Sequence, residues 1–125
     1  MASQRLVSRL FLVAAVYGIL ATVPLYFSAG KIAHDYPPAI THLEYFYGFA
    51  GVALAWQFLF LIISRDPVRY RLAILPGILE KLGWGIAVLV LFLQGQVAGT
   101  LMIFGSIDLL MAAAFAWAFW ATREN

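Results

Sequence analysis

The chain contains no cysteine and few charged residues. Its 125 residues include 8 Lys and Arg, 6 Asp and Glu and 2 His, so that only 11% of the chain is charged. The missing cysteines exclude disulfides, thiolate metal sites, iron–sulfur clusters and nucleophilic thiols. Two histidines, His34 and His42, are too few for most all-imidazole metal sites. We therefore expect no metal and no other cofactor.

The abundant residues are apolar, and their abundance excludes a soluble fold. Hydrophobic residues make up 64% of the chain, whereas soluble domains contain about 45–50% apolar and about 25% charged residues. The length suits a single domain and leaves no residues for a second. The composition predicts one integral membrane domain over residues 1–125.

Long gaps between charged residues predict four transmembrane helices. Arg9 and Lys31 enclose 21 uncharged residues and Glu44 and Arg65 enclose 20, each enough to cross about 30 Å of hydrocarbon at about 1.5 Å per residue. The first run is longer than a usual signal-peptide core, so we expect it to be retained. Two further apolar stretches are joined by a short polar turn, which is typical of a helical hairpin. We expect an all-α, integral membrane four-helix bundle of two antiparallel helical hairpins, with spans at about 9–29, 43–63, 72–93 and 99–121.

The basic residues favour one orientation in the membrane. Cytoplasmic loops carry an excess of Lys and Arg, and an inside N-terminus leaves only Lys31 on the outer side. The residues then on the cytoplasmic side are Arg5, Arg9, Arg65, Arg69, Arg71 and Arg123. We expect both termini to be cytoplasmic, which argues against a dual-topology antiparallel dimer. The formal net charge of +2 is explained by topology and predicts no nucleic-acid partner.

Three local signals predict where helices begin and bend. Thr41 and Glu44 have the spacing of a capping box, so the second span should start near His42. Asp66 followed by Pro67 predicts the start of the third helix, with aspartate as N-cap and proline as first residue. Pro76 would then lie inside that helix, where proline removes a backbone hydrogen bond, and we expect a kink.

Charged residues interrupt the third and fourth spans, where the bilayer makes each charge cost about 2.5–3.5 kcal/mol. Counting about 1.5 Å per residue places a polar side chain from every span near one plane. This midplane polar cluster comprises Tyr17, Gln57, Glu80, Lys81 and Asp108. It suggests a protonatable or substrate-binding site, but nothing in the sequence indicates a path to it from either side of the membrane, so we favour a structural alternative. The alternative is an ion pair between Lys81 and Asp108, with Glu80 and Gln57 as hydrogen-bonding contacts between helices.

Small residues predict where the helices approach closely. Gly77 and Gly83 flank Glu80 in the third helix, Gly105 and Ala112 flank Asp108 in the fourth, and Gly48, Gly51 and Ala55 form a stripe on the second span. We interpret this stripe as a contact inside the bundle or a homo-oligomer interface.

A second set of polar residues lies in the outer loop. This outer-surface cluster comprises His34, Asp35, His42 and Glu44. It suggests a metal or quinone-headgroup site, but on a helix residues two apart point about 200° apart, so His42 and Glu44 would diverge. We favour an interfacial role for this cluster. Aromatic residues near the cytoplasmic ends, among them Trp56, Trp117, Trp120, Phe115 and Phe119, are interpreted as membrane anchors rather than a binding site.

Four segments carry a resemblance to known proteins: residues 36–42, 44–48, 64–67 and 79–83. On these segments the chain resembles an uncharacterised family of small bacterial four-span inner-membrane proteins. The resemblance implies a multi-pass protein of the bacterial inner (cytoplasmic) membrane and transfers no function. The size and layout are also loosely similar to DoxX-like membrane proteins.

Three functions remain open from the sequence. The first is a non-enzymatic accessory or scaffold subunit that contacts the lipid bilayer and a membrane-protein partner or forms a homo-oligomer. The second is a proton-coupled transporter that uses the midplane polar cluster. The third is a protein that binds a lipid or quinone there, or an enzyme that acts on one with Glu80 or Asp108 as acid or base. No nucleophile or metal constellation supports the enzyme, so no catalytic residue is assigned.

Overall fold

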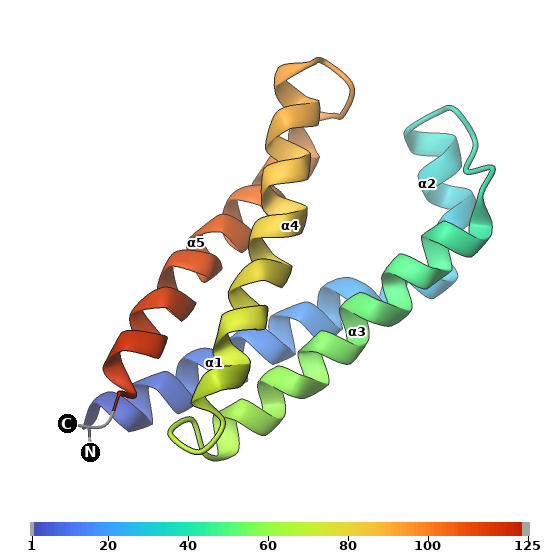
Figure 1. Cartoon of the computed structure of the whole chain (residues 1–125). Helices are drawn as coiled ribbons and strands as arrows, with labels where there is room; N and C mark the ends of the chain where they lie inside the picture. The colour runs from blue at the N-terminus through green and yellow to red at the C-terminus, as the bar shows by residue number, and fades with distance from the viewer. Residues whose placement is uncertain (1, 124–125) are drawn as a thin grey trace.

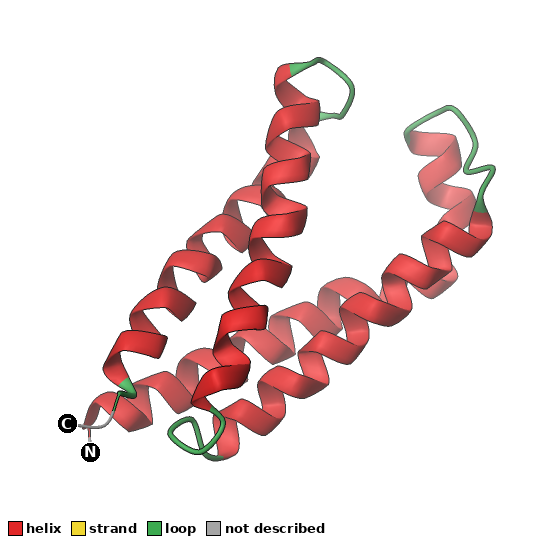
Figure 2. Ribbon diagram, viewed as in Figure 1, coloured by secondary structure: helices red, strands yellow, loops and turns green. Residues whose placement is uncertain are grey.

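The chain is mainly helical over residues 2–123, the part described by the computed structural model. Its α-helices are α1 (Ala2–Thr22), α2 (Ala29–Asp35), α3 (Leu43–Arg65), α4 (Ile74–Leu93) and α5 (Gly99–Ala121), with 3-10 helices η1 (Val23–Phe27) and η2 (Arg71–Ala73). No strand occurs among these residues, and short loops join the helices (Figure 2). The short helix α2 lies between the first two apolar stretches, where no helix was predicted.

Four stretches are long and apolar enough to cross a membrane, which indicates a multi-pass membrane protein. They are Ser3–Phe27, Leu43–Arg65, Arg71–Leu93 and Gly99–Ala121. In hydrocarbon every backbone N–H and C=O must find a partner within the protein, and a helix satisfies them within one segment. The helix α1 begins at Ala2, before the span predicted to start at residue 9. Its N-terminal part contains Arg5 and Arg9 and precedes the apolar run.

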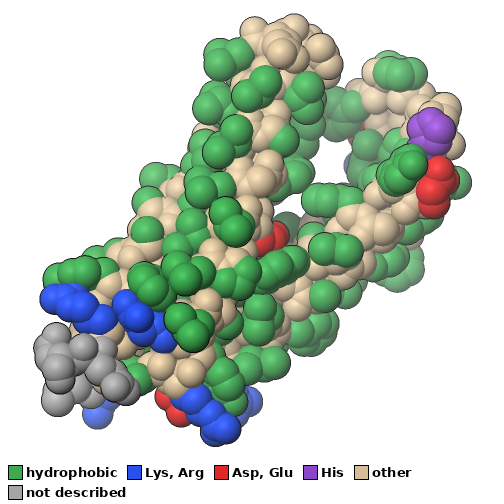
Figure 3. Space-filling model, in the orientation of Figure 1, with side chains coloured by type: hydrophobic (Ala, Val, Ile, Leu, Met, Phe, Trp, Pro, Cys, Tyr) green, Lys and Arg blue, Asp and Glu red, His purple; other side chains and the backbone are tan. Residues whose placement is uncertain are grey.

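The long helices pack in two pairs rather than as one closed bundle. The helix α1 lies along α3, and α4 lies along α5 (Figure 1). The pairs touch near the start of α1 and the end of α5, which lie at the same end of the molecule, and they diverge towards the opposite end. Most of the Lys and Arg side chains visible in Figure 3 gather at the end where the pairs touch.

The pairs are held together by a buried core at this joined end. Its members are Val7, Phe11, Ala14, Ala15, Phe60, Ile63, Ile74, Phe115 and Ala118. Three of their rings come from three helices: Phe115 stacks on Phe11 with centroids 4.4 Å apart and meets the edge of Phe60 at 5.1 Å. Such offset and edge contacts are favourable arrangements for aromatic rings. The core therefore joins α1, α3 and α5 at a single point.

Gly77 and Arg71 make further contacts at the joined end. Gly77 lets α4 approach this core, because a Cβ there would lie 3.1 Å from a ring carbon of Phe60. Arg71 in η2 donates from Nε to the carbonyl of Phe119 at 2.8 Å, and its guanidinium lies 3.6 Å from the centroid of that ring. This contact occupies a carbonyl in the last turn of α5, where carbonyls lack helical partners. It ties the segment before α4 to the end of α5.

The turn between α4 and α5 follows the glycine-bearing pattern seen in the sequence. Gly95 adopts a φ of 74°, a left-handed conformation that glycine takes without a Cβ penalty. Gln96 N–H donates to the carbonyl of Leu91 at 2.8 Å, and Gly95 N–H donates to that of Phe92 at 2.9 Å. This pair of bonds is the Schellman motif, which ends a helix by satisfying its last carbonyls.

The helix α3 begins where the sequence predicts the second span to start, but the predicted capping interactions need correction. The N-cap of α3 is His42, whose side chain makes no capping bond, so the capping box of Thr41 and Glu44 is not formed. Asp66 Oδ1 does accept the N–H of Arg69 at 3.2 Å, but it caps an isolated turn, and α4 begins only at Ile74.

The late start of α4 also changes the role of Pro76. This proline is the third residue of α4, in the first turn, where N–H groups lack helical partners in any case. It therefore lies at the beginning of the helix. The predicted kink required a proline inside the helix.

Candidate functional site

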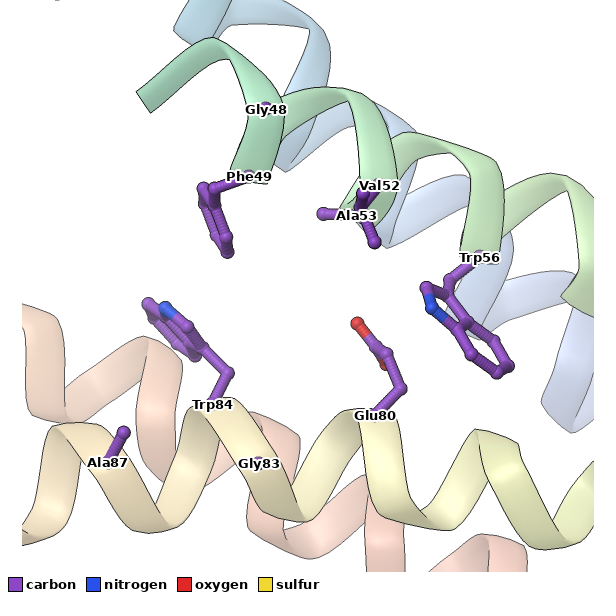
Figure 4. Close-up of a pocket in the computed structure, with 9 residues that line it drawn as sticks. All are labelled: Gly48, Phe49, Val52, Ala53, Trp56, Glu80, Gly83, Trp84 and Ala87. Carbon is purple, nitrogen blue, oxygen red and sulfur yellow. The ribbon is translucent and has the colours of Figure 1, made fainter. Parts of the chain in front are cut away.

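A cleft of about 470 Å³ lies between the two helix pairs where they diverge. One wall belongs to α3 and the other to α4, and the lining residues are Gly48, Phe49, Val52, Ala53, Trp56, Glu80, Gly83, Trp84 and Ala87. Figure 4 shows the Glu80 carboxyl pointing into the space between the walls, with Trp56 on one side of it and Trp84 on the other. Glu80 is the only acidic or basic residue among these lining residues.

Each wall is one face of a helix. On α3 the lining residues Phe49, Val52, Ala53 and Trp56 follow the spacing i, i+3, i+4, i+7, and on α4 the residues Glu80, Gly83, Trp84 and Ala87 do the same. Residues at this spacing lie on the same side of an α-helix. The cleft is therefore formed by two regular helix faces that do not touch.

Gly48 on one wall and Gly83 on the other face open space. A Cβ built at Gly48 or Gly83 would meet no atom within 4 Å. Gly83 therefore borders the cleft and makes none of the close helix contact predicted for it. The close contact between α4 and α5 uses Gly85 instead, whose Cβ would lie 3.2 Å from the carbonyl oxygen of Gly105.

The three charged residues of the midplane polar cluster lie together at the base of the cleft. Lys81 is only 2% exposed, and its Nζ lies 3.4 Å from Asp108 Oδ1 and 3.7 Å from Glu80 Oε2. The ammonium also lies 5.4 Å from the centroid of the Phe60 ring. Lys81 is directed to α5 and the core, whereas the neighbouring Glu80 faces the cleft, because adjacent helical residues point about 100° apart.

Gln57 occupies a different contact, between α1 and α3. The Gln57 side chain is buried and donates from Nε2 to the carbonyl of Ala53 at 2.8 Å, within its own helix. Its amide fills the space beside Gly18, where a Cβ would overlap the Gln57 side chain. Tyr17, the neighbour of Gly18, is half-buried. The charged trio is thus separate from the hydrogen bond that Gln57 makes.

Two buried oxygens in this region have no hydrogen-bond partner within the described residues. They are Gln57 Oε1 and Glu80 Oε2. A buried polar atom without a partner is uncommon in proteins and calls for a physical explanation. Glu80 Oε2 lies 3.7 Å from Lys81 Nζ, beyond hydrogen-bond distance but close enough for an ion pair.

The outer-surface cluster separates into two exposed pairs. His34 Nδ1 lies 3.3 Å from Asp35 Oδ1, and His42 Nδ1 lies 3.4 Å from Glu44 Oε1. The expectation that His42 and Glu44 point apart is wrong, because His42 precedes α3 and has non-helical backbone angles. Over residues 2–123, no group of three or more His, Asp or Glu is placed to hold a metal ion.

The aromatic residues interpreted as anchors have different surroundings. Phe115 is completely buried in the core, Trp56 lines the cleft, and Trp120 remains 56% exposed, as an anchor would be. The sequence interpretation missed Trp84 and Phe49 as well. Their shared helical face with Glu80 on α4 and with Trp56 on α3 was the signal that could have identified them.

Comparison of the chain with protein-family models, with curated proteins and with solved structures found no match. The resemblance to small bacterial four-span proteins stays a prediction. The chemistry of the cleft is the basis for a functional assignment.

Proposed function

We propose that the protein binds an amphiphilic small molecule of the membrane in the cleft between its helix pairs. The observation that carries this proposal is the combination of apolar walls with one carboxyl, that of Glu80, at the base. Ligand sites typically consist of apolar and aromatic surfaces with a few placed polar groups. A lipid or a quinone-type molecule has the matching division into an apolar body and a polar group.

The size of the cleft favours a small ligand over a partner helix. Its volume of about 470 Å³ falls inside the range of about 300–1,000 Å³ typical of ligand pockets. A membrane-spanning helix about 30 Å long and about 10 Å wide occupies on the order of 2,000 Å³. A helix would therefore require the pairs to separate further.

Binding fits this geometry better than transport. Release on the far side of the membrane would need a path through the joined end, where Phe11, Phe60 and Phe115 are completely buried and in mutual contact. A proton-coupled carrier would have to take this core apart in every cycle.

We further propose that the two helix pairs are antiparallel hairpins in a bacterial inner membrane, with both termini cytoplasmic. The joined end would then lie on the cytoplasmic side, which its Lys and Arg side chains support. The cleft would open within the outer half of the bilayer, where a lipid-soluble ligand enters sideways from the hydrocarbon.

The first experiment is native mass spectrometry of the protein extracted directly from its membrane into lipid nanodiscs. Wild type should retain an amphiphile. Ala87→Phe, which fills the cleft from α4, should lose it. Ala113→Phe is the matched control, because Ala113 is an exposed alanine of α5 outside the cleft, and it should behave as wild type. Absence of a ligand from wild type, or equal retention in the two variants, would refute the proposal.

A second candidate function is the accessory or scaffold subunit predicted from the sequence. The observation that favours it is the open space around Gly48 and Gly83, because exposed glycines let membrane helices approach closely. A membrane-protein partner should then co-purify at fixed stoichiometry with wild type but not with Gly83→Leu. Gly30→Leu, at an equally open glycine of α2, is its control.

A further inference from the structure

The charges at the base of the cleft do not balance. When all three groups are ionised, the carboxylates of Glu80 and Asp108 share the single ammonium of Lys81, at 3.7 Å and 3.4 Å. The trio then carries one negative charge in excess, in a region where the bilayer makes an uncompensated charge costly. One further positive charge would neutralise it.

That charge has one place to bind. Lys81 is buried and directed to Asp108, so the inner side of the trio is already occupied. The carboxyl of Glu80, by contrast, lines the cleft and points into it. A positive group must therefore reach Glu80 from the cleft.

The walls of the cleft suit an organic cation better than a metal ion. Trp56 and Trp84 flank the Glu80 carboxyl, and Phe49 lies across from Trp84 (Figure 4). The faces of aromatic rings attract cations, and aromatic cages recognise quaternary ammonium groups in this way. Hard metal ions need several oxygen ligands, whereas Glu80 is the only carboxylate that lines the cleft.

We propose that the ligand of this cleft is a lipophilic organic cation, whose charge lies against Glu80 and between the indoles of Trp56 and Trp84. This inference rests on the proposed binding function and specifies the charge of the ligand. The apolar part of the cation lies against the small and aromatic residues towards the open end, such as Phe49 and Ala87.

A proton on Glu80 is the competing positive charge. The groups that face Glu80 are Lys81 on its own helix and Asp108 on α5, the wall on α3 contributes no titratable side chain, and Tyr17 is the half-buried titratable residue of α1. Cation binding therefore displaces a proton, and the affinity falls as the pH is lowered, by up to about tenfold per pH unit while Glu80 is protonated.

The test uses two ions of the same size and shape and opposite charge. Purified protein in nanodiscs is titrated by calorimetry with tetraphenylphosphonium or tetraphenylborate, with empty nanodiscs as the background. Wild type should bind the cation saturably and the anion no better than empty nanodiscs do. Equal binding of both ions would overturn the proposal.

Substitutions in the protein test where the positive charge of the ligand binds. Glu80→Gln should weaken binding of the cation at least about 30-fold, as removal of a buried charge partner does. Glu44→Gln, which removes an exposed carboxylate far along α3, should leave it unchanged. Trp84→Leu should weaken binding about three- to thirty-fold, and Trp84→Phe less, because a ring face remains.

The pH dependence gives a readout on wild type that does not depend on the folding of a variant. Tetraphenylphosphonium should bind more weakly as the pH is lowered, and where Glu80 is protonated in the free protein its binding should release a proton, seen as a heat that varies with the buffer. Affinity that is independent of pH and of Glu80→Gln would overturn the proposal.

Decylubiquinone, a neutral amphiphile, separates the two proposals. If it binds and Ala87→Phe removes it, while the cation binds no better than the anion, the cleft is a ligand site for neutral molecules and only the cation proposal fails. If neither probe binds wild type and no native amphiphile is retained, both proposals fail.

Discussion

The joined end and the open end of the molecule are built from the same four helices, yet they pack in opposite ways. At the joined end Phe11, Phe60 and Phe115 are completely buried and in mutual contact. At the open end the facing surfaces of α3 and α4 carry small residues such as Gly48 and Gly83, and a cleft lies between them.

Hydropathy does not distinguish the two ends, because both are apolar over their whole length. In a bilayer the lipid is as apolar as the side chains, so helices associate through close packing and hydrogen bonds rather than through removal from water. Contact forms where side chains interlock and stops where they do not. The charged trio lies at the boundary between the closely packed joined end and the open cleft.

The largest expected effect comes from the lysine at this boundary. Lys81→Met leaves two carboxyls at the base of the cleft without their ammonium, and loss of one partner from a buried ion pair costs about 3–5 kcal/mol. Reversible unfolding by SDS in mixed micelles, followed by tryptophan fluorescence, measures the change. Adding Asp108→Leu should restore a large part of the lost stability, because it removes the orphaned charge.

The control for Lys81→Met is Lys31→Met, at an exposed lysine of α2. It should change the free energy of unfolding by no more than about 0.5 kcal/mol. Equal losses for the two lysines would show that the trio contributes nothing to stability.

A smaller loss is expected when the joined end loses a ring. Phe60 is completely buried and contacts Phe11, Phe115 and Trp56, so Phe60→Ala leaves a cavity and costs about 3 kcal/mol in the same assay. Phe58→Ala, two residues away on α3 at a position 53% exposed, should cost much less. If the two substitutions were equivalent, the joined end would not be held by its core.

The smallest effects compare two glycines of α4. A Cβ at Gly85 would lie 2.8 Å from the side chain of Leu109 and 3.2 Å from the Gly105 carbonyl, so Gly85→Ala should destabilise by about 1–3 kcal/mol. Gly83 faces open space, and alanine favours a helix by up to about 1 kcal/mol over glycine. Gly83→Ala should therefore be neutral or stabilising. A lower Tm for Gly83→Ala than for Gly85→Ala would contradict the assignment of the close contact with α5 to the Gly85 face of α4.

Features that depend on one segment could be predicted from the sequence. The charge-free runs predicted four long apolar helices, and Gly95 predicted a turn whose bonds close α4. The capping bonds expected from local patterns did not form as predicted. Thr41 and Glu44 carry a capping pattern, but α3 starts after His42 and places Glu44 beside its ring.

Part of the candidate site was also within reach of the sequence. Glu80, Lys81 and Asp108 were singled out by the cost of charge in a bilayer, and the structure brings them together. Counting residues placed Gln57 at the same depth in the membrane. Depth does not say in which direction a side chain points, and the side chain of Gln57 lies beside Gly18 in another helix contact.

The sequence by itself determined which stretches form the long apolar helices and which of their residues are too polar for lipid, because both follow from the free energy of each segment in hydrocarbon. The tertiary structure alone decided which faces meet: that Lys81 is directed to Asp108, that Glu80 is left to the cleft, and that Trp56 and Trp84 stand on either side of it. The physical reason is that association between apolar helices depends on the shapes of two surfaces at once, and a single helical face carries only one of them.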